Sequence, residues 1–142
     1  MGPDLVLLFD GMCAVCSRAV RFVLARDRVG TMTFAPLQGE TARAIRASHP
    51  ELAGVDALVL VERARGQGSA EWTGRVWVGS EAVLRVAEYL GGPWGAARAL
   101  RVVPGFLRRW AYAAFAARRH RVGRHLEPPP PPDARTRERF LP

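Results

Sequence analysis

The residues with the most distinctive chemistry are Cys13 and Cys16, the only two cysteines in the chain. A short apolar run over residues 5–9 precedes them, and a helix-like pattern follows. This order predicts a strand, a tight turn that carries the C-x-x-C pair, and a helix. Because the N-terminal end of a helix favours a thiolate over a thiol, the arrangement is typical of a dithiol/disulfide redox centre.

The helical pattern assigns different surroundings to the two sulfur atoms. Apolar or small residues recur at helical spacing from Cys16 to Leu24, which places Cys16 on the buried stripe and Cys13 in an accessible first turn. We therefore expect Cys13 to attack a substrate disulfide and Cys16 to resolve the mixed disulfide. Arg18 and the first amides of the helix are expected to favour the thiolate form of Cys13.

Four further residues are candidates for the same site. Asp10 has two interpretations: its carboxylate accepts amides at the turn, or it takes the proton of Cys16 in the second step. We interpret Gly11 as a backbone requirement of the tight turn. Gln38 and Asp56 are predicted to approach the cysteines from loops at the same end of the sheet, in supporting or substrate-binding roles.

The remaining pattern predicts an α/β fold: a mixed four-stranded sheet covered by helices, with a C-terminal helical extension. Strands are expected over residues 5–9, 31–35, 57–61 and 75–78, with the second parallel to the first and the last two antiparallel. Helices are expected over residues 16–29, 39–48, 80–90, 94–103 and 104–121, and a turn-rich loop over 66–69. We divide the chain into a core (1–92), an extension packed on it (93–126) and a flexible Pro/Arg-rich tail (127–142).

Composition places the chain among single-domain proteins with a proper core. It has 142 residues, of which 49% are hydrophobic, and no apolar run approaches the length of a membrane span. The first residues do not resemble a secretory signal, because Asp4 stands where basic residues are usual. We therefore expect a cytoplasmic location, where a C-x-x-C pair is catalytic or metal-binding more often than structural.

Positive charge is concentrated in the last third of the chain. Residues 1–97 hold ten arginines and ten acidic residues, whereas residues 98–142 hold eleven arginines and three acidic residues. Three interpretations stay open for Arg108–Arg124: a helix with aromatics on the core and arginines outside, weak contact with an anionic membrane surface or a partner, or nucleic-acid binding. No recognised nucleic-acid motif supports the third interpretation.

The segment from Asp10 to Cys16 (DGMCAVC) resembles the D-G-x-C-x-x-C signature of the DCC family of predicted thiol-disulfide oxidoreductases. Residues 35–38, 78–82, 104–112, 118–119 and 121–123 are also similar to that family. The resemblance implies a thioredoxin-like fold and a redox-active cysteine pair, with a protein or small-molecule disulfide or thiol as substrate. Thioredoxins carry a cis-proline before the hairpin strand, but the equivalent residues 54–57 contain no proline, which argues against the usual mode of peptide docking.

A redox-sensing or metal-binding adaptor is the alternative function. A C-x-x-C pair is half of a zinc site, and His120 and His125 have ligand-like spacing. The cysteines, however, sit on a predicted strand-to-helix turn, about 100 residues from the histidines. We therefore expect a thiol-disulfide oxidoreductase that uses no organic cofactor and no metal.

Overall fold

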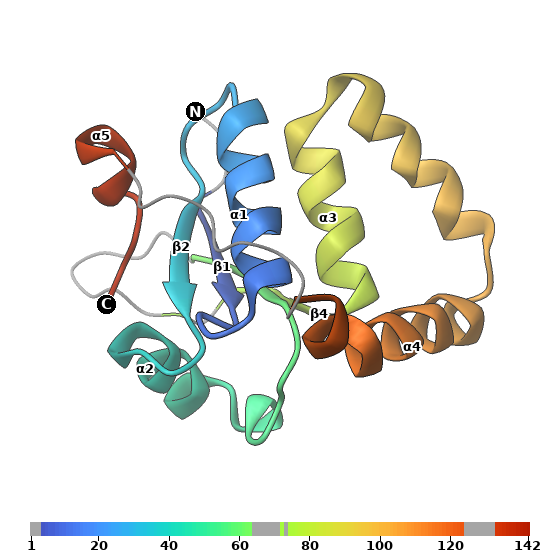
Figure 1. Ribbon diagram of the computed structural model, residues 1–142, viewed down its shortest axis with the longest axis horizontal. Helices are drawn as coiled ribbons and strands as arrows, with labels where there is room; N and C mark the ends of the chain where they lie inside the picture. Colours follow the sequence, from blue (N-terminus) through green and yellow to red (C-terminus); the bar gives the residue numbers. More distant parts are fainter. Residues whose placement is uncertain (1–3, 64–71, 73, 124–132) are drawn as a thin grey trace.

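Four strands form one mixed sheet in the computed structural model of the chain, which describes residues 4–63, 72, 74–123 and 133–142 (Figure 1). The strands are β1 (Leu5–Phe9), β2 (Thr33–Pro36), β3 (Val59–Glu62) and β4 (Val76–Val78), in the spatial order β2-β1-β3-β4. β1 pairs in parallel with β2 and antiparallel with β3, and β3 pairs antiparallel with β4. The mixed four-stranded α/β sheet predicted from the sequence is thus confirmed.

The central strand β1 is buried on both faces, which explains why its five residues are all apolar. Leu5, Leu7 and Phe9 point into one core, together with residues of α1 (Ala14–Arg26) and α3 (Ser80–Leu90). Val6 and Leu8 point into a second core on the opposite face, together with residues of α2 (Glu40–Ser48) and the short 3₁₀ helix η1 (Pro50–Leu52). Helices therefore cover both faces of the sheet (Figure 1).

The C-terminal extension consists of the 3₁₀ helix η2 (Gly92–Val102) and the helix α4 (Gly105–Gly123). The last turn of α4 lies against the first turn of α1, since a Cβ atom built on Gly123 would be 3.8 Å from the side chains of Ala14 and Val15. In Figure 1, α4 runs across the end of the molecule at which α1 begins. The extension therefore reaches the end of the sheet where the cysteines lie.

The side chains of α4 are arranged differently from the simplest expectation for this basic helix. Phe106, Trp110 and Phe115 are exposed, with 63%, 71% and 51% of their surface accessible, whereas Arg119 is buried. The expectation of aromatics on the core and arginines outside is therefore wrong for these four residues. The inner side of α4 is instead occupied by Tyr112 and Arg119, which are seven residues apart and so lie on one helix face.

The last ten residues also differ from the flexible tail expected over 127–142. α5 (Ala134–Arg137) leads into a short extended segment beside β2, where the amide of Phe34 donates to the oxygen of Arg139 (2.8 Å) and the amide of Leu141 to the oxygen of Phe34 (2.7 Å). The ring of Phe140 packs against those of Phe9 and Phe34. The proline run and the loop expected over residues 66–69 lie outside the described residues.

Candidate functional site

The first cysteine stands directly at the start of α1. Cys13 is the N-cap residue, with an extended backbone (φ −94°, ψ 116°), and its carbonyl accepts a hydrogen bond from the amide of Ser17 (3.0 Å). Its own amide donates to the backbone oxygen of Asp10 (3.2 Å), which closes the turn after β1. The first turn of α1 holds no acidic residue. Cys13 therefore lies at the positive end of the helix dipole, as the sequence predicts.

The two cysteine side chains are hydrogen-bonded to each other, and both are free thiols. Their burial is the reverse of the expectation, because Cys13 is only 3% exposed whereas Cys16 is half-buried. The sequence pattern describes only the faces of α1. It carries no information about α4, which closes over the first turn of α1 from about 100 residues further along the chain.

The carboxylate of Asp10 is buried and organises the turn. Its Oδ1 accepts hydrogen bonds from the amide of Met12 (3.0 Å) and from Nε2 of Gln38 (3.1 Å). These bonds match the turn-forming interpretation of Asp10, and they bring Gln38 to the site. Gly11 has no left-handed backbone, and a Cβ atom there would lie 3.4 Å from the Cβ of Pro36. The turn therefore limits space at Gly11 without requiring a special backbone conformation.

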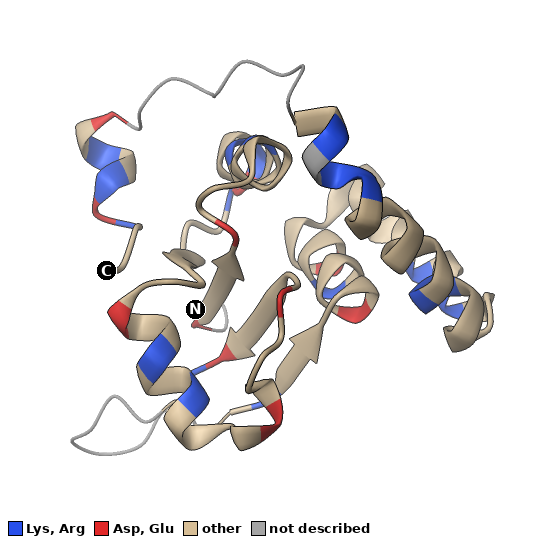
Figure 2. Cartoon of the chain, turned by 60° about the horizontal axis from the view of Figure 1, so that its bottom comes forward, with Lys and Arg blue, Asp and Glu red and all other residues tan. Residues whose placement is uncertain are grey.

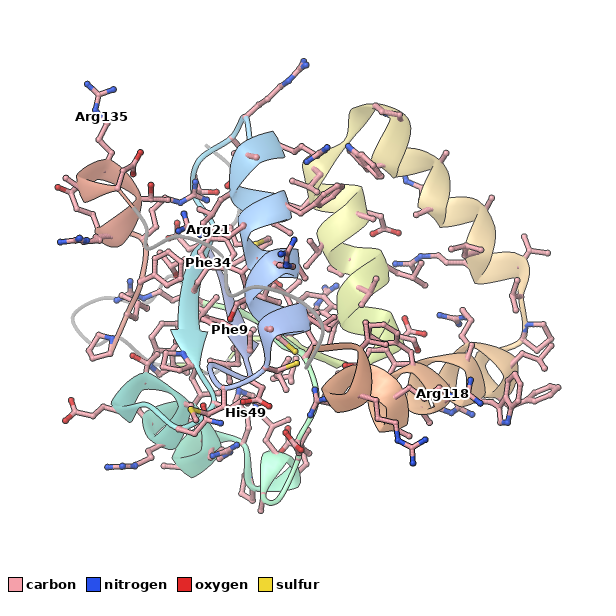
Figure 3. All side chains as sticks on the ribbon, in the orientation of Figure 1. Phe9, Arg21, Phe34, His49, Arg118 and Arg135 are labelled. Carbon is pink, nitrogen blue, oxygen red and sulfur yellow. The ribbon has the colours of Figure 1, made fainter. Side chains whose placement is uncertain are left out.

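A buried guanidinium completes the site, and it belongs to Arg119 of α4. Nη1 of Arg119 lies 3.8 Å from Sγ of Cys16. Nη2 lies 3.1 Å from Oδ1 of Asp56, donates to the backbone oxygen of Asp56 (3.4 Å), and is 3.9 Å from Oδ2 of Asp10. Arg119 thus ties the C-x-x-C turn to the loop that precedes β3 (Figure 3, where the sulfur atoms at the start of α1 lie beside the end of α4).

The arginine beside the sulfur atoms is therefore not the one that sequence reasoning selected. Arg18 is exposed on α1, whereas Arg119 is 4% exposed. The sequence holds one signal for Arg119, namely its position two helical turns after Tyr112 on the same face of α4. This spacing predicts a buried Arg119 only if Tyr112 is already known to face the core. Asp56, which the sequence did select, reaches the site through Arg119 and keeps an exposed carboxylate.

The pKa of the Cys16 thiol is raised to about 12, first by burial and then by the hydrogen bond to Cys13 and the negative charges of Cys13 and Asp10. The positive charge of Arg119 acts in the opposite direction. Cys16 is consequently protonated at neutral pH, and its thiol is available to donate to the sulfur of Cys13.

Within the part of the chain that the structure describes, no group of three or more His, Cys, Asp and Glu residues is placed to hold a metal ion. His125 lies outside the described residues, and so does the side chain of His120. Of the four ligands of the alternative zinc site, only the two cysteines therefore belong to the described side chains.

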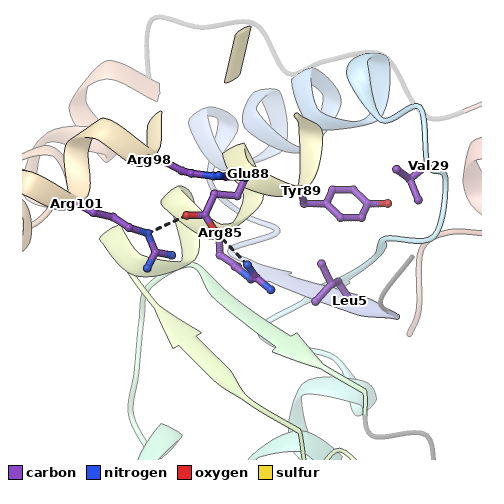
Figure 4. Close-up of a pocket in the computed structure, with 7 residues that line it drawn as sticks. All are labelled: Leu5, Val29, Arg85, Glu88, Tyr89, Arg98 and Arg101. Carbon is purple, nitrogen blue, oxygen red and sulfur yellow. Dashed lines mark hydrogen bonds and ion pairs between the residues drawn. The ribbon is translucent and has the colours of Figure 1, made fainter. Parts of the chain in front are cut away.

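A cavity of about 570 Å³ lies away from the cysteines, between α3, η2 and Leu5 at the start of β1 (Figure 4). The carboxylate of Glu88 projects between two arginines there, and it pairs with Arg85 (3.0 Å) and Arg101 (2.8 Å). The pair with Arg101 joins η2 to α3, whereas Arg85 lies on α3 itself, and neither cysteine lines the cavity. The cavity is therefore no part of the dithiol site.

A thioredoxin-like mixed sheet with a C-x-x-C pair at the start of its first helix defines the class of thiol-disulfide oxidoreductase-like proteins. Residues 7–125 match the family of DCC1-like thiol-disulfide oxidoreductases, and the chain belongs to this family. The uncharacterized protein YuxK of Bacillus subtilis (strain 168) is 31% identical over 141 residues, which cover 99% of this chain and 96% of that protein. A chloroplastic DCC family protein of Arabidopsis thaliana is 30% identical over 117 residues, which cover 81% of this chain and 62% of that protein. No solved structure matches the chain.

Proposed function

We propose that this chain is a thiol-disulfide oxidoreductase that exchanges disulfides through Cys13 and Cys16. The observation that carries the proposal is the position of Cys13 as the N-cap residue of α1, with the Cys16 thiol one turn further on and next to it. Cysteines at positions i and i+3 of one helical turn can close into a disulfide, and the first of them lies at the positive end of the helix dipole. Membership of the family supports the same chemistry.

The reaction proceeds in two exchange steps. The thiolate of Cys13 attacks one sulfur of the substrate disulfide, the substrate S–S bond breaks, and the other substrate sulfur leaves and takes up a proton. Cys16 then loses its proton and attacks the sulfur of Cys13, which releases the second substrate thiol and leaves a Cys13–Cys16 disulfide. Two electrons pass from the protein to the substrate, and a thiol or dithiol reductant returns them in the next cycle.

Asp10 is proposed as the acceptor of the Cys16 proton in the second step. Its Oδ1 is engaged by Met12 and Gln38, whereas Oδ2 lies 3.9 Å from the guanidinium of Arg119. Gln38 supports this role by fixing the orientation of the carboxylate, and Gly11 allows the turn to pass close to Pro36. Asp56 supports it by holding Arg119 over the turn.

Turnover with a dithiol donor tests the proposal, using a small disulfide and the disulfides of insulin as two substrates. We expect Cys13→Ser to abolish turnover and Cys16→Ser to accumulate a mixed disulfide that mass spectrometry detects. Arg43→Gln, an exposed change on α2, serves as the matched control. A Cys13→Ser protein with full activity would contradict the assignment. A wild-type protein without turnover but with reversible disulfide formation would favour the redox-sensing adaptor.

The second candidate function is attachment to an anionic membrane surface through α4. Phe106, Trp110, Ala113 and Ala117 follow one another at helical spacing and are all exposed, which forms an apolar stripe on the outer side of the helix. Arginines flank the stripe, and residues 92–123 contain no acidic residue (Figure 2, where α4 carries blue segments and no red ones). Anionic headgroups complement this charge, and the aromatic rings suit the interface below them. No helix among the described residues is long and apolar enough to cross a membrane.

Vesicle binding tests this second candidate directly. We expect the protein to sediment with vesicles rich in phosphatidylglycerol at low salt and to be released as the salt concentration rises. It should not sediment with vesicles of phosphatidylcholine alone. Trp110→Ser should weaken the binding, whereas Arg43→Gln on α2 should leave it unchanged. Equal binding to both vesicle types, or none at low salt, would contradict the candidate.

The proposed site of the redox reaction is the cytoplasm, where a thiol reductant is available.

A further inference from the structure

We infer that Arg119 is a catalytic residue, whose guanidinium stabilises the thiolate of Cys16 when that sulfur resolves the mixed disulfide. This inference rests on the proposed function and adds a residue that the C-x-x-C motif does not contain. Nη1 of Arg119 lies 3.8 Å from Sγ of Cys16, which is one of the two reacting atoms.

The burial of Arg119 distinguishes this contact from an ordinary surface ion pair. The side chain is 5% exposed, and its Nε has no hydrogen-bond partner among the described residues. Placing a cation there carries a desolvation cost, which an apolar side chain of similar length would avoid. The carboxylate that pairs best with it, on Asp56, is 70% exposed and therefore compensates the cost only in part. A purely structural role does not explain why a cation occupies this position.

The second exchange step requires a thiolate on Cys16, which the guanidinium of Arg119 stabilises. In the reduced pair, the thiol of Cys16 donates to Cys13, and this bond helps to keep Cys16 protonated. Once the sulfur of Cys13 is bonded to substrate, it carries no negative charge, so the charge repulsion from Cys13 disappears. Burial and the negative charge of Asp10 still oppose ionisation of Cys16, while Arg119 favours it. The guanidinium thus acts most strongly at the moment when Cys16 must become a nucleophile.

Arg119 also holds the partner loop in the geometry that this step requires. Nη2 donates to the backbone oxygen of Asp56 and lies 3.1 Å from its carboxylate, while Nη1 faces Cys16. The planar guanidinium can make these contacts at once because its nitrogen atoms are arranged in a rigid fork. A lysine at this position would keep the charge and lose the second set of contacts.

The test uses the Cys13→Ala protein, in which Cys16 is the only thiol and its ionisation is followed by thiolate absorbance near 240 nm. We expect Arg119→Gln to lower the thiolate fraction of Cys16 about tenfold at a given pH, which corresponds to one pKa unit. Arg118→Gln, which removes the same charge from the exposed neighbour on α4, should leave the titration unchanged (Figure 3). Arg119→Lys should restore most of the thiolate fraction. Equal titrations in the Arg119→Gln and Arg118→Gln proteins would overturn the inference.

Two further measurements keep the inference falsifiable if Arg119→Gln does not fold. In the folded Cys13→Ala protein, the ¹⁵N resonances of the Arg119 guanidinium should shift with the midpoint of the Cys16 titration, and resonances that stay constant through it would overturn the inference. In the two-cysteine protein, Arg119→Lys should slow the decay of the mixed disulfide more than its formation. Turnover of the wild-type protein is measured in parallel, so that failure of the proposed function itself is recognised separately.

Discussion

The hydroxyl of Tyr112 accepts a hydrogen bond from the backbone amide of Leu58 at 3.0 Å, and this bond fastens α4 to the residue just before β3. The same tyrosine ring lies against Gly79, where a Cβ atom would come within 3.3 Å of two ring carbons. Arg119 follows on the same face of α4, two turns later. The position of the Arg119 guanidinium beside the cysteines therefore depends on the contacts of Tyr112 with Leu58 and Gly79.

Removal of the Tyr112 hydroxyl is expected to weaken this attachment. Tyr112→Phe leaves the half-buried amide of Leu58 without its acceptor, which should lower the free energy of unfolding by about 1 kcal/mol. Urea unfolding followed by circular dichroism measures the change. Ala113→Ser, an exposed substitution next along α4, is the control and should change stability by much less. An unchanged unfolding midpoint for Tyr112→Phe would contradict the role of this bond.

Gly79 is expected to be sensitive to any side chain. Its φ of 61° lies in the left-handed region, and Tyr112 fills the space where a Cβ would be, so Gly79→Ala should cost at least ~1–2 kcal/mol of stability. Gly95→Ala is a matched control, because a Cβ there meets nothing within 4 Å and its φ is not positive. Thermal unfolding of both proteins makes the comparison. Equal melting temperatures would show that the Gly79–Tyr112 contact does not constrain the fold.

The C-terminal segment is expected to contribute to the stability of the sheet. The ring of Phe140 packs 6.3 Å from that of Phe9 and 5.6 Å from that of Phe34, so Phe140→Ala should reduce the free energy of unfolding by about 3 kcal/mol. The control is Arg135→Ala, an exposed change on α5. Denaturant titration of both proteins tests this expectation. A loss below that of the control would mean that the segment does not hold to β2 in solution.

Alkaline pH is expected to destabilise the protein through Cys16. Its pKa is raised in the folded protein from the ordinary 9.0 to about 12, so folding is unaffected by this group below pH 9. As the pH rises from 9 toward 12, the unfolded chain loses the proton first and stability falls. Cys16→Ser should flatten this decline between pH 9 and about pH 12, although burial also raises the pKa of Tyr112 and leaves a residual slope. Identical slopes in the two proteins would contradict the shift at Cys16.

The sequence predicts the sheet and the position of Cys13 well because both depend on local patterns. The apolar run of β1 and the turn after Asp10 are read from adjacent residues. The burial of Cys13 and the role of Arg119 depend instead on how α4 packs against α1, and no local periodicity carries that information. The ordered C-terminus was missed for a related reason, because the proline run before it suggests disorder, whereas long-range backbone hydrogen bonds to Phe34 and the packing of Phe140 hold the segment beside β2.

Disulfide formation between Cys13 and Cys16 at defined redox poise tests the central claim most directly. The protein is equilibrated with graded ratios of reduced and oxidised dithiothreitol or glutathione, free thiols are alkylated, and mass spectrometry counts the modified cysteines. The account predicts a reversible two-electron transition in which both cysteines lose their reactivity together at one potential. Two cysteines that remain alkylated at every ratio, or that form only mixed disulfides with glutathione, would contradict it.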